Sequence, residues 1–388
     1  MALDLRYGGS SAGWKEFWAI LKSVIKSIRS GNWQAGPEAA AMEREAADFL
    51  GVNHGILTTS GSCAGLLALQ ALELPKGSEV IIPAVTFPTI FNIILQCGLK
   101  PVVVDCDIGT YNLNLESAWR AFSEKTRAII AVHAVGNPVD MPKLMELVKD
   151  KNIYVIEDNC DGWGSSIGKG KVGSFGDISF TSFHAAHIVS MGVGGGIFTS
   201  NAEMAKRVRM YRDWGRQANT TEPHKVKTLP ADYNPRFVYD KIGWNFQILE
   251  LQAAMGRVQL RKSEDIKKAR KANYDYLVEK LAKYPDLILP STIANADICW
   301  FSLPLSTRGD RGPLVAYLEK AGIETRSMFA GNILRHPAYS GMKIKHGNLD
   351  EANWILEHSF WITVHPRLTQ EAREYIVKTF DDYYAQTK

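Results

Sequence analysis

The chain has few of the cysteines that are typical of proteins stabilised by disulfides or by bound metal ions. It contains only five cysteines in 388 residues, and none of them forms a C-x-x-C pair. Their odd number and wide spacing argue against a zinc finger or a redox dithiol. We therefore expect a reduced protein of the cytoplasm.

Long apolar runs and a marked excess of charge are missing as well. No stretch of about 18 apolar residues occurs, which predicts that the chain does not span a membrane. The apolar segment 17–28 is interrupted by Lys22 and Lys26, so it predicts an amphipathic helix rather than a signal peptide. Lys plus Arg number 45 and Asp plus Glu 41, a net charge of +4. So small a surplus argues against nucleic-acid binding but suits an anionic small substrate.

What the chain does have is a hydrophobic content of 46%, enough for a sizeable core, and a regular alternation of segments. Short apolar runs predict strands at 55–59, 80–83, 102–105, 128–132, 154–157, 178–183 and 196–199. The stretches between them predict helices at 38–50, 64–72, 117–125 and 141–149. This alternation predicts an α/β fold with a mostly parallel sheet between helices, whose ligands lie at the carboxyl ends of the strands.

The pattern changes after residue 248. Apolar residues recur at three- and four-residue spacing from Leu251, and this helical pattern continues toward Leu281. A strand at 300–304 and helices at 312–321 and 370–384 are expected to follow. We therefore expect a large domain over 36–250, and a linker helix with a smaller α+β domain over 251–388. Residues 1–35 are expected to pack with the small domain.

Residues 60–62, Ser-Gly-Ser, stand between an expected strand and an expected helix. Backbone N–H groups and the dipole at a helix start favour a bound phosphate. The same residue types are also common as simple helix caps, and the cluster alone leaves both possibilities open.

Glu157 and Asp158 end an expected buried strand. A carboxylate at such a place must be paired or solvated. A pyridinium nitrogen is one partner that keeps it ionised, and a helix N-cap is the alternative.

His184 and His187 follow another expected strand and precede a glycine-rich loop at 191–196. Two His at this spacing on a helix could bind a metal. No Cys or carboxylate is spaced to complete such a site locally, so we expect none.

Together with Phe87, these clusters occur in the order that is typical of pyridoxal-phosphate (PLP) enzymes of fold type I. The chain most closely resembles the sugar aminotransferase and dehydratase family of that fold, over nearly its whole length. The motifs that carry the resemblance are 30–33 (SGNW), 83–87 (PAVTF), 104–107 (VDCD), 136–138 (GNP), 172–177 (VGSFGD) and 243–246 (GWNF). The resemblance implies a large PLP-binding domain and a smaller C-terminal α+β domain.

His187 departs from the aminotransferases of this family. They carry at this position the Lys that binds the cofactor covalently, whereas this chain has no Lys from 172 to 205. An imidazole cannot form that bond, but it carries protons near neutral pH. The His resembles the 4-keto-6-deoxyhexose 3-dehydratases, which implies pyridoxamine phosphate held without a covalent bond and His187 as the base. The implied reaction removes the C3 hydroxyl of a nucleotide-linked 4-keto-6-deoxyhexose and gives a 3,6-dideoxy-4-keto sugar.

A second departure concerns an iron–sulfur cluster. One kind of these dehydratases, which acts on a CDP-sugar, carries a 2Fe–2S cluster on Cys residues after an Arg that matches Arg216, and takes electrons from a reductase. Residues 216–250 contain no Cys, and the Tyr usual in the His turn is here His184. The resemblance therefore implies a dehydratase without a cluster. An electron-accepting dehydrase with a reductase partner, and a mutant or non-catalytic aminotransferase relative without its Lys, stay open.

The resemblance also assigns the cofactor-binding residues. Gly61, Ser62 and Ser182 are expected to hold the phosphate, Asp158 the pyridine nitrogen, and Phe87 to stack on the ring. Asn245 is expected to reach the phosphate from the partner subunit, which implies a homodimer with a shared active site.

The resemblance is less specific about the amino donor and about the residues that bind the sugar. By resemblance the donor that converts PLP to pyridoxamine phosphate is glutamate. The candidates for binding the sugar or its diphosphate are His184, Arg216, Arg326, Arg335 and Asn332. The nucleotide stays open.

Overall fold

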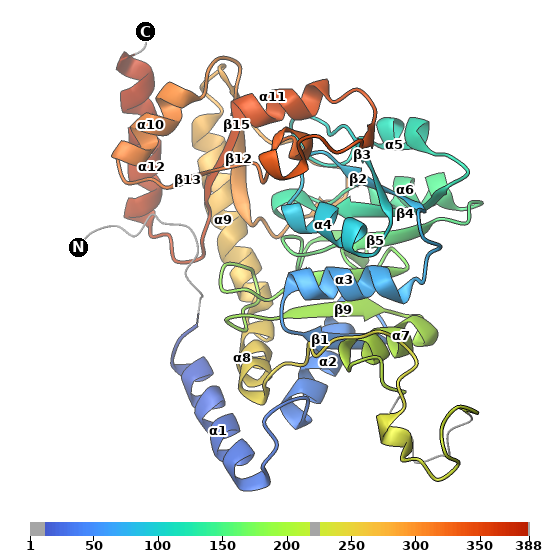
Figure 1. Ribbon diagram of the computed structural model, residues 1–388. Helices are drawn as coiled ribbons and strands as arrows, with labels where there is room; N and C mark the ends of the chain where they lie inside the picture. The colour runs from blue at the N-terminus through green and yellow to red at the C-terminus, as the bar shows by residue number, and fades with distance from the viewer. Residues whose placement is uncertain (1–11, 218–225, 387–388) are drawn as a thin grey trace.

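The computed structural model describes residues 12–217 and 226–386. Its centre is an eight-stranded sheet (Figure 1) in the order β1-β9-β8-β5-β4-β2-β3-β14. The strands are β1 (His54–Thr58), β9 (Gly195–Thr199), β8 (Ile178–Ser182), β5 (Tyr154–Asp158), β4 (Thr126–Val132), β2 (Glu79–Pro83), β3 (Lys100–Val104) and β14 (Lys345–His346). All neighbouring pairs are parallel except β1–β9 and β8–β9. The predicted mostly parallel sheet is confirmed, with β9 as its antiparallel member.

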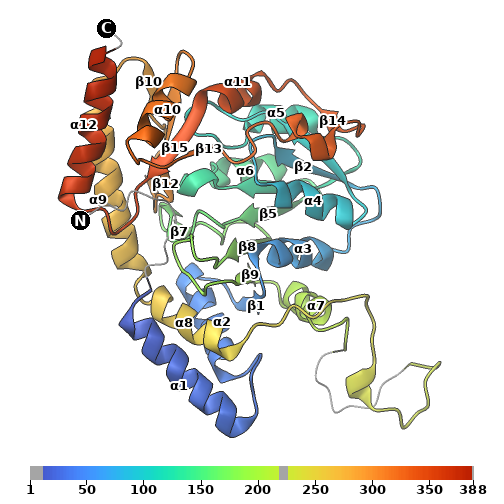
Figure 2. The same ribbon diagram turned by 60° about the vertical axis from the view of Figure 1, so that its left-hand side comes forward.

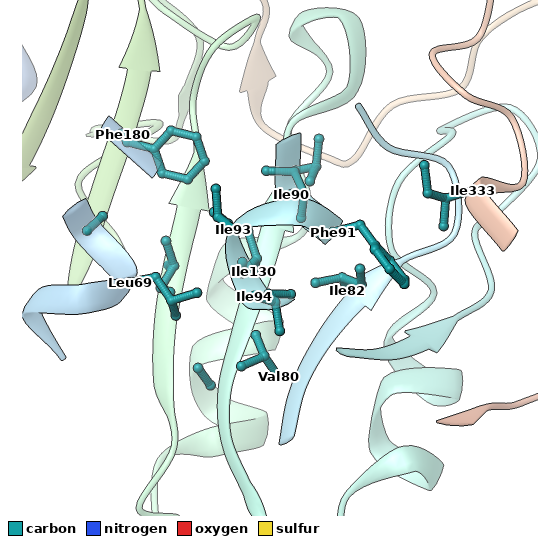
Figure 3. Packing of buried hydrophobic residues seen from close by; sticks show 14 of the residues in the cluster. Leu69, Val80, Ile82, Ile90, Phe91, Ile93, Ile94, Ile130, Phe180 and Ile333 are labelled. Atoms are coloured by element: carbon teal, nitrogen blue, oxygen red, sulfur yellow. The ribbon is translucent and has the colours of Figure 1, made fainter. Parts of the chain in front are cut away.

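Helices cover this sheet, as the alternation of segments predicts. They are α2 (Pro37–Leu50), α3 (Gly61–Ala71), α4 (Pro88–Gln96), α5 (Leu115–Ala121), α6 (Met141–Val148) and α7 (Ala202–Arg212). Figure 3 shows Leu69 of α3 and Ile93 and Ile94 of α4 against Ile130 and Phe180 of the strands. All of these side chains are buried, so burial of apolar area on this face fixes the helices on the sheet.

A second, four-stranded sheet lies in the C-terminal part. It is antiparallel, in the order β10 (Leu287–Ile288), β12 (Ser302–Thr307), β15 (Ser359–Thr363) and β13 (Thr325–Ser327). Its helices are α10 (Gly312–Lys320), α11 (Asp350–His358) and α12 (Gln370–Gln386). A small third sheet joins β11 (Ala296–Asp297), β6 (Ser166–Ile167) and β7 (Gly170–Lys171).

The helical pattern predicted toward Leu281 is divided between two helices, α8 (Glu250–Leu260) and α9 (Ser263–Leu281), which follow one another along the molecule (Figure 1). No helix among the described residues is long and apolar enough to cross a membrane.

The N-terminal helix α1 (Trp14–Ser30) packs beside α8, as Figure 2 shows. The side that it buries is polar: the carboxylate of Glu16 accepts hydrogen bonds from the side chains of Gln259 and Lys262. Its large apolar side chains, including Trp14 and Ile28, are exposed instead. The predicted amphipathic helix is therefore present, with its polar side toward its own chain.

Candidate active site

Three strands bring two of the predicted phosphate-binding segments together. Thr58, the last residue of β1, pairs with Gly195, and Gly195 pairs with Ser182 at the end of β8. The turn after β1 therefore lies against Ser182. A Cβ on Gly61 would lie 2.6 Å from the Cβ of Ser182, so only glycine allows this approach.

The turn after β1 has the groups that bind a phosphate. Ser60 caps α3 by accepting a hydrogen bond from the backbone N–H of Cys63 at 3.1 Å. Ser62 is exposed in the first turn of α3, with its hydroxyl 2.8 Å from that of Thr89. Together with the positive end of the helix dipole and the Ser182 hydroxyl, the turn offers a cradle for a phosphate dianion.

Asp158 is the last residue of β5 and is only 6% exposed. Its Oδ1 accepts a hydrogen bond from the backbone N–H of Cys160 at 3.0 Å, and burial raises its pKa to about 6. A buried carboxylate with one such donor is stabilised in its ionised form by a cationic partner. A pyridinium nitrogen fits this requirement.

The neighbouring residue, Glu157, uses its carboxylate for hydrogen bonds within the protein. Its carboxylate is buried and accepts hydrogen bonds from the backbone N–H groups of Gly173, Phe175 and Gly176, and it meets Nε2 of His133 at 3.1 Å. Glu157 therefore holds the loop 172–177 in place, and Asp158 alone is left for a ligand.

Phe87 follows β2 as the N-terminal cap residue of α4, and its side chain is 57% exposed. The segment before it is fixed by residues 330–333: Ala330 donates to the carbonyl of Thr86, and Ile333 donates to that of Ala84. An exposed aromatic ring on a fixed backbone at this edge of the sheet is suited to stacking on a planar ligand.

His187 lies in a turn, not in a helix, because its N–H donates to the carbonyl of His184 and no helical bonds continue. The turn belongs to a hairpin loop between β8 and β9, closed by backbone bonds from Phe183 to Gly194 and from Ala185 to Gly192. The His187 side chain is 17% exposed. Both ends of this loop are thus attached to the sheet edge that carries Ser182.

Two neighbours of His187 were not predicted from the sequence. Nδ1 of His187 lies 3.3 Å from Oδ1 of Asp161, and its ring lies 5.4 Å from that of Phe301. Asp161 stands three residues after Asp158, a spacing that could have drawn attention to it. Phe301 lies more than 100 positions away and is brought in only by the fold.

His184 is exposed, with its ring 6.4 Å from that of His187, and Nδ1 accepts a hydrogen bond from the N–H of Ala186. Within residues 12–217 and 226–386, no group of three or more His, Cys, Asp or Glu is arranged to hold a metal ion. The five cysteines are free thiols.

The C-terminal residues that are candidates for binding the sugar differ in burial and in their hydrogen-bond partners. Asn332 is buried, and both ends of its amide are engaged: Oδ1 accepts from the N–H of Leu334, and Nδ2 donates to Asn353. Arg335 donates to the same Asn353 at 3.4 Å, and Arg326 is exposed and ion-paired with Glu324. Asn332 thus fixes the loop beside Phe87, whereas the two arginines have guanidinium groups at the surface.

Arg216 lies over aromatic rings, with its guanidinium carbon 5.1 Å from the centre of Trp214 and 5.7 Å from that of Phe237. It also lines a hollow of about 480 Å³ together with Arg209 and Arg212. None of the residues predicted to bind the cofactor lines this hollow.

Asn245 is exposed and lies opposite Asp213 in an isolated bridge. The carbonyl of the next residue, Phe246, accepts a hydrogen bond from the N–H of Thr59 at 3.1 Å. The segment that carries Asn245 is therefore anchored beside the turn after β1 of its own chain, with the Asn245 side chain at the surface.

The sequence from residue 17 to residue 381 matches the DegT/DnrJ/EryC1/StrS aminotransferase family. The chain belongs to this family. It is 36% identical to the lipopolysaccharide biosynthesis protein RfbH of Salmonella typhimurium, over 94% of this chain and 89% of that protein. It is 35% identical to a dTDP-4-dehydro-2,6-dideoxy-D-glucose 3-dehydratase of Saccharopolyspora spinosa, over 91% of this chain and 81% of that protein.

A solved structure is similar over almost the whole fold. It is a GDP-4-keto-6-deoxymannose-3-dehydratase with a trapped PLP-glutamate geminal diamine. The TM-score is 0.88 at 27% identity, and the match covers 96% of this chain and 99% of that chain. The predicted PLP fold type I is confirmed.

Proposed function

We propose that this chain is a PLP- and pyridoxamine-phosphate-dependent sugar 3-dehydratase, with His187 as its proton-transfer base. The observation that carries the proposal is the placement of an imidazole, instead of the family's Lys, in the turn between Ser182 and Gly195. Two of the similar proteins are named 3-dehydratases, and one of them was solved with PLP.

The described residues fit the cofactor. Gly61, Ser62 and Ser182 form the phosphate cradle, and Phe87 offers a ring face. Asp158 supplies the buried carboxylate for the pyridine nitrogen, which keeps that nitrogen protonated. When bound, the cofactor supplies an electron sink, and the protein supplies its orientation.

His187 moves the proton. Its imidazole takes and returns a proton near neutral pH, and it cannot bond covalently to the cofactor as a lysine amine does. A lysine at this position would favour amino transfer to the sugar. With an imidazole at this position, the productive reaction is loss of the C3 hydroxyl of a nucleotide-linked 4-keto-6-deoxyhexose. One substitution thus changes the reaction while the fold stays the same.

The amino donor in this proposal is glutamate, in line with the glutamate trapped in the solved relative. His184, exposed beside His187, is a candidate for contact with the sugar, and Arg216, Arg326 and Arg335 are candidates for the diphosphate. Asn332 serves this site by fixing the loop beside Phe87.

We further infer a homodimer in which Asn245 serves the cofactor of the partner subunit. The exposed large side chains on the segment around Asn245, among them Tyr239, Ile242 and Trp244, support this inference. An apolar surface of this kind is typical of protein–protein contacts.

The test is a product assay on the purified chain with PLP, glutamate and, in turn, CDP-, GDP- and dTDP-4-keto-6-deoxyhexoses, without a reductase. We expect release of ammonia and a 3-deoxy-4-keto sugar from one of them. An amino sugar as the product would identify an aminotransferase, and strict dependence on a reductase would identify an electron-accepting dehydrase. Either result would overturn the proposal.

A further inference from the structure

Asp161 and His187 form a buried pair that the reaction as described so far does not use. Oδ1 of Asp161 lies 3.3 Å from Nδ1 of His187, and the two side chains are 7% and 17% exposed. Oδ2 of Asp161 and Nδ1 of His187 are both buried, and neither makes a hydrogen bond within the described part of the chain. A proton on Nδ1 that points at Oδ1 of Asp161 would give the buried Nδ1 the hydrogen-bond partner that it otherwise lacks.

The backbone around Asp161 is held firmly. Two residues before it, the N–H of Asn159 donates to the carbonyl of Phe180, and the Asn159 amide donates to the carbonyl of Val172. The Asn159 carbonyl in turn accepts from the hydroxyl of Thr181. A carboxylate carried on so constrained a turn can fix the direction of a neighbouring ring.

The His187 ring is also held by Phe301, whose plane makes an angle of 34° with it. Phe301 is fixed in turn, because its N–H donates to Val135 and its carbonyl accepts from the Arg270 guanidinium. The ring therefore has an apolar neighbour and a carboxylate at Nδ1.

We propose that Asp161 is a positioning residue for the proton transfer: its carboxylate accepts a hydrogen bond from Nδ1–H of His187, which keeps the proton on Nδ1 and leaves Nε2 unprotonated, as the base. The proposal rests on the proposed function of His187. A neutral imidazole carries one proton, on either Nδ1 or Nε2. Because an ionised carboxylate can only accept a hydrogen bond, it favours the tautomer with the proton on Nδ1. The other ionisable groups around the pair include His184 on the same turn, Cys160 next to Asp161, Asp158 on β5 and Arg270 behind Phe301.

The first measurement needs no sugar and no variant of Asp161. Nitrogen-15 NMR of histidine-labelled protein with bound PLP reports which ring nitrogen carries the proton, and His187→Asn assigns the signal. We expect the Nδ1–H tautomer for neutral His187. The Nε2–H tautomer would overturn the role of Asp161. The tautomer can be measured even if the protein dehydrates no sugar. A failed product assay would overturn the proposed function, whereas the tautomer alone tests the role of Asp161.

The second measurement uses Asp161→Asn. Its amide can donate to Nδ1, so we expect the proton to move to Nε2 and kcat to fall by about 10²–10⁴, with unchanged affinity for PLP. The control is Asp177→Asn, which removes a carboxylate that binds the N–H of Val155 near the other end of β5. It should leave both the tautomer and kcat as in the parent. Unchanged kcat in Asp161→Asn, or an equal loss in the control, would contradict the proposal.

Discussion

Gly61, the first residue of α3, and Ser182, the last residue of β8, meet so closely that no side chain fits between them: a Cβ on Gly61 would lie 2.6 Å from that of Ser182. The contact joins the start of α3 to the end of β8 and so fixes the distance between the helix N–H groups and the Ser182 hydroxyl. Both sides of the proposed phosphate cradle depend on this contact.

Gly61→Ala should therefore widen the cradle. The added methyl group pushes Ser182 away, which should cost about 1–3 kcal/mol of folding free energy and weaken PLP binding. Fluorescence titration with PLP and thermal unfolding measure the two effects. Gly309→Ala is the control, because nothing lies within 4 Å of a Cβ there. Equal affinities for PLP in the two variants would show that Gly61 has no part in the cradle.

Asp158→Asn should separate stability from activity. Burial raises the pKa of Asp158 from 3.8 to about 6, so the folded, cofactor-free protein binds this proton more tightly than the unfolded chain. Its stability should therefore fall as the pH rises from about 4 through about 6. Because Asn carries no charge, the cofactor-free variant should be more stable than the parent at pH 8, by up to about 3 kcal/mol, and the gain should shrink toward pH 4.

Turnover should nevertheless be crippled in Asp158→Asn, because an amide does not keep a pyridine nitrogen protonated. Urea unfolding at several pH values and the product assay measure the two effects. No helix begins directly after Asp158, so the helix-cap alternative does not apply. If Asp158 only holds the turn through the N–H of Cys160, the variant should keep its turnover.

His187→Lys should convert reversible cofactor binding into covalent binding. In the parent, borohydride treatment followed by mass spectrometry should find no PLP attached to any lysine. In the variant, the lysine amine should bond covalently to PLP, in a form that borohydride reduces and that has its own absorption band. The rate of dehydration should fall steeply. His187→Asn should bind the cofactor but lose about 10²–10⁴ in rate, because it moves no proton. A lysine variant that dehydrates as fast as the parent would remove His187 from the mechanism.

A mixture of two inactive chains tests the shared site. Asn245→Ala and His187→Ala homodimers each lack one residue at both sites, whereas a hybrid dimer has one site with both residues intact. Random exchange should make half of the dimers hybrid, so about a quarter of the parent activity should return. Proof of subunit exchange by native mass spectrometry without any recovery would place Asn245 at its own chain's site.

The sequence predicted the parts of the fold that depend on local pattern. The buried strands were evident as short apolar runs, and the turn at 60–62 and the glycine-rich loop at 191–196 were evident from residue types beside strand ends. Asp158 could be singled out because a carboxylate at the end of a buried strand demands a partner.

Long-range contacts could not be predicted in this way. Phe301 reaches His187 only after the C-terminal sheet is in place, and β14 joins the edge of the large sheet from a segment with no strand pattern. The division between α8 and α9 was also missed, because residues 261–265 contain no Gly or Pro that would mark the end of a helix. Glu157 and Asp158 looked alike in sequence, and only the loop 172–177 separates their roles.

The hairpin loop between Ser182 and Gly195 is closed by backbone hydrogen bonds. Its backbone bonds join Phe183 to Gly194 and Ala185 to Gly192 and make no use of the side chain at position 187. The backbone bonds that close this loop therefore do not depend on which side chain stands at position 187. A substitution at position 187 should therefore leave the closed hairpin and the position of Ser182 as they are, and change only the contacts of the side chain with Asp161 and Phe301.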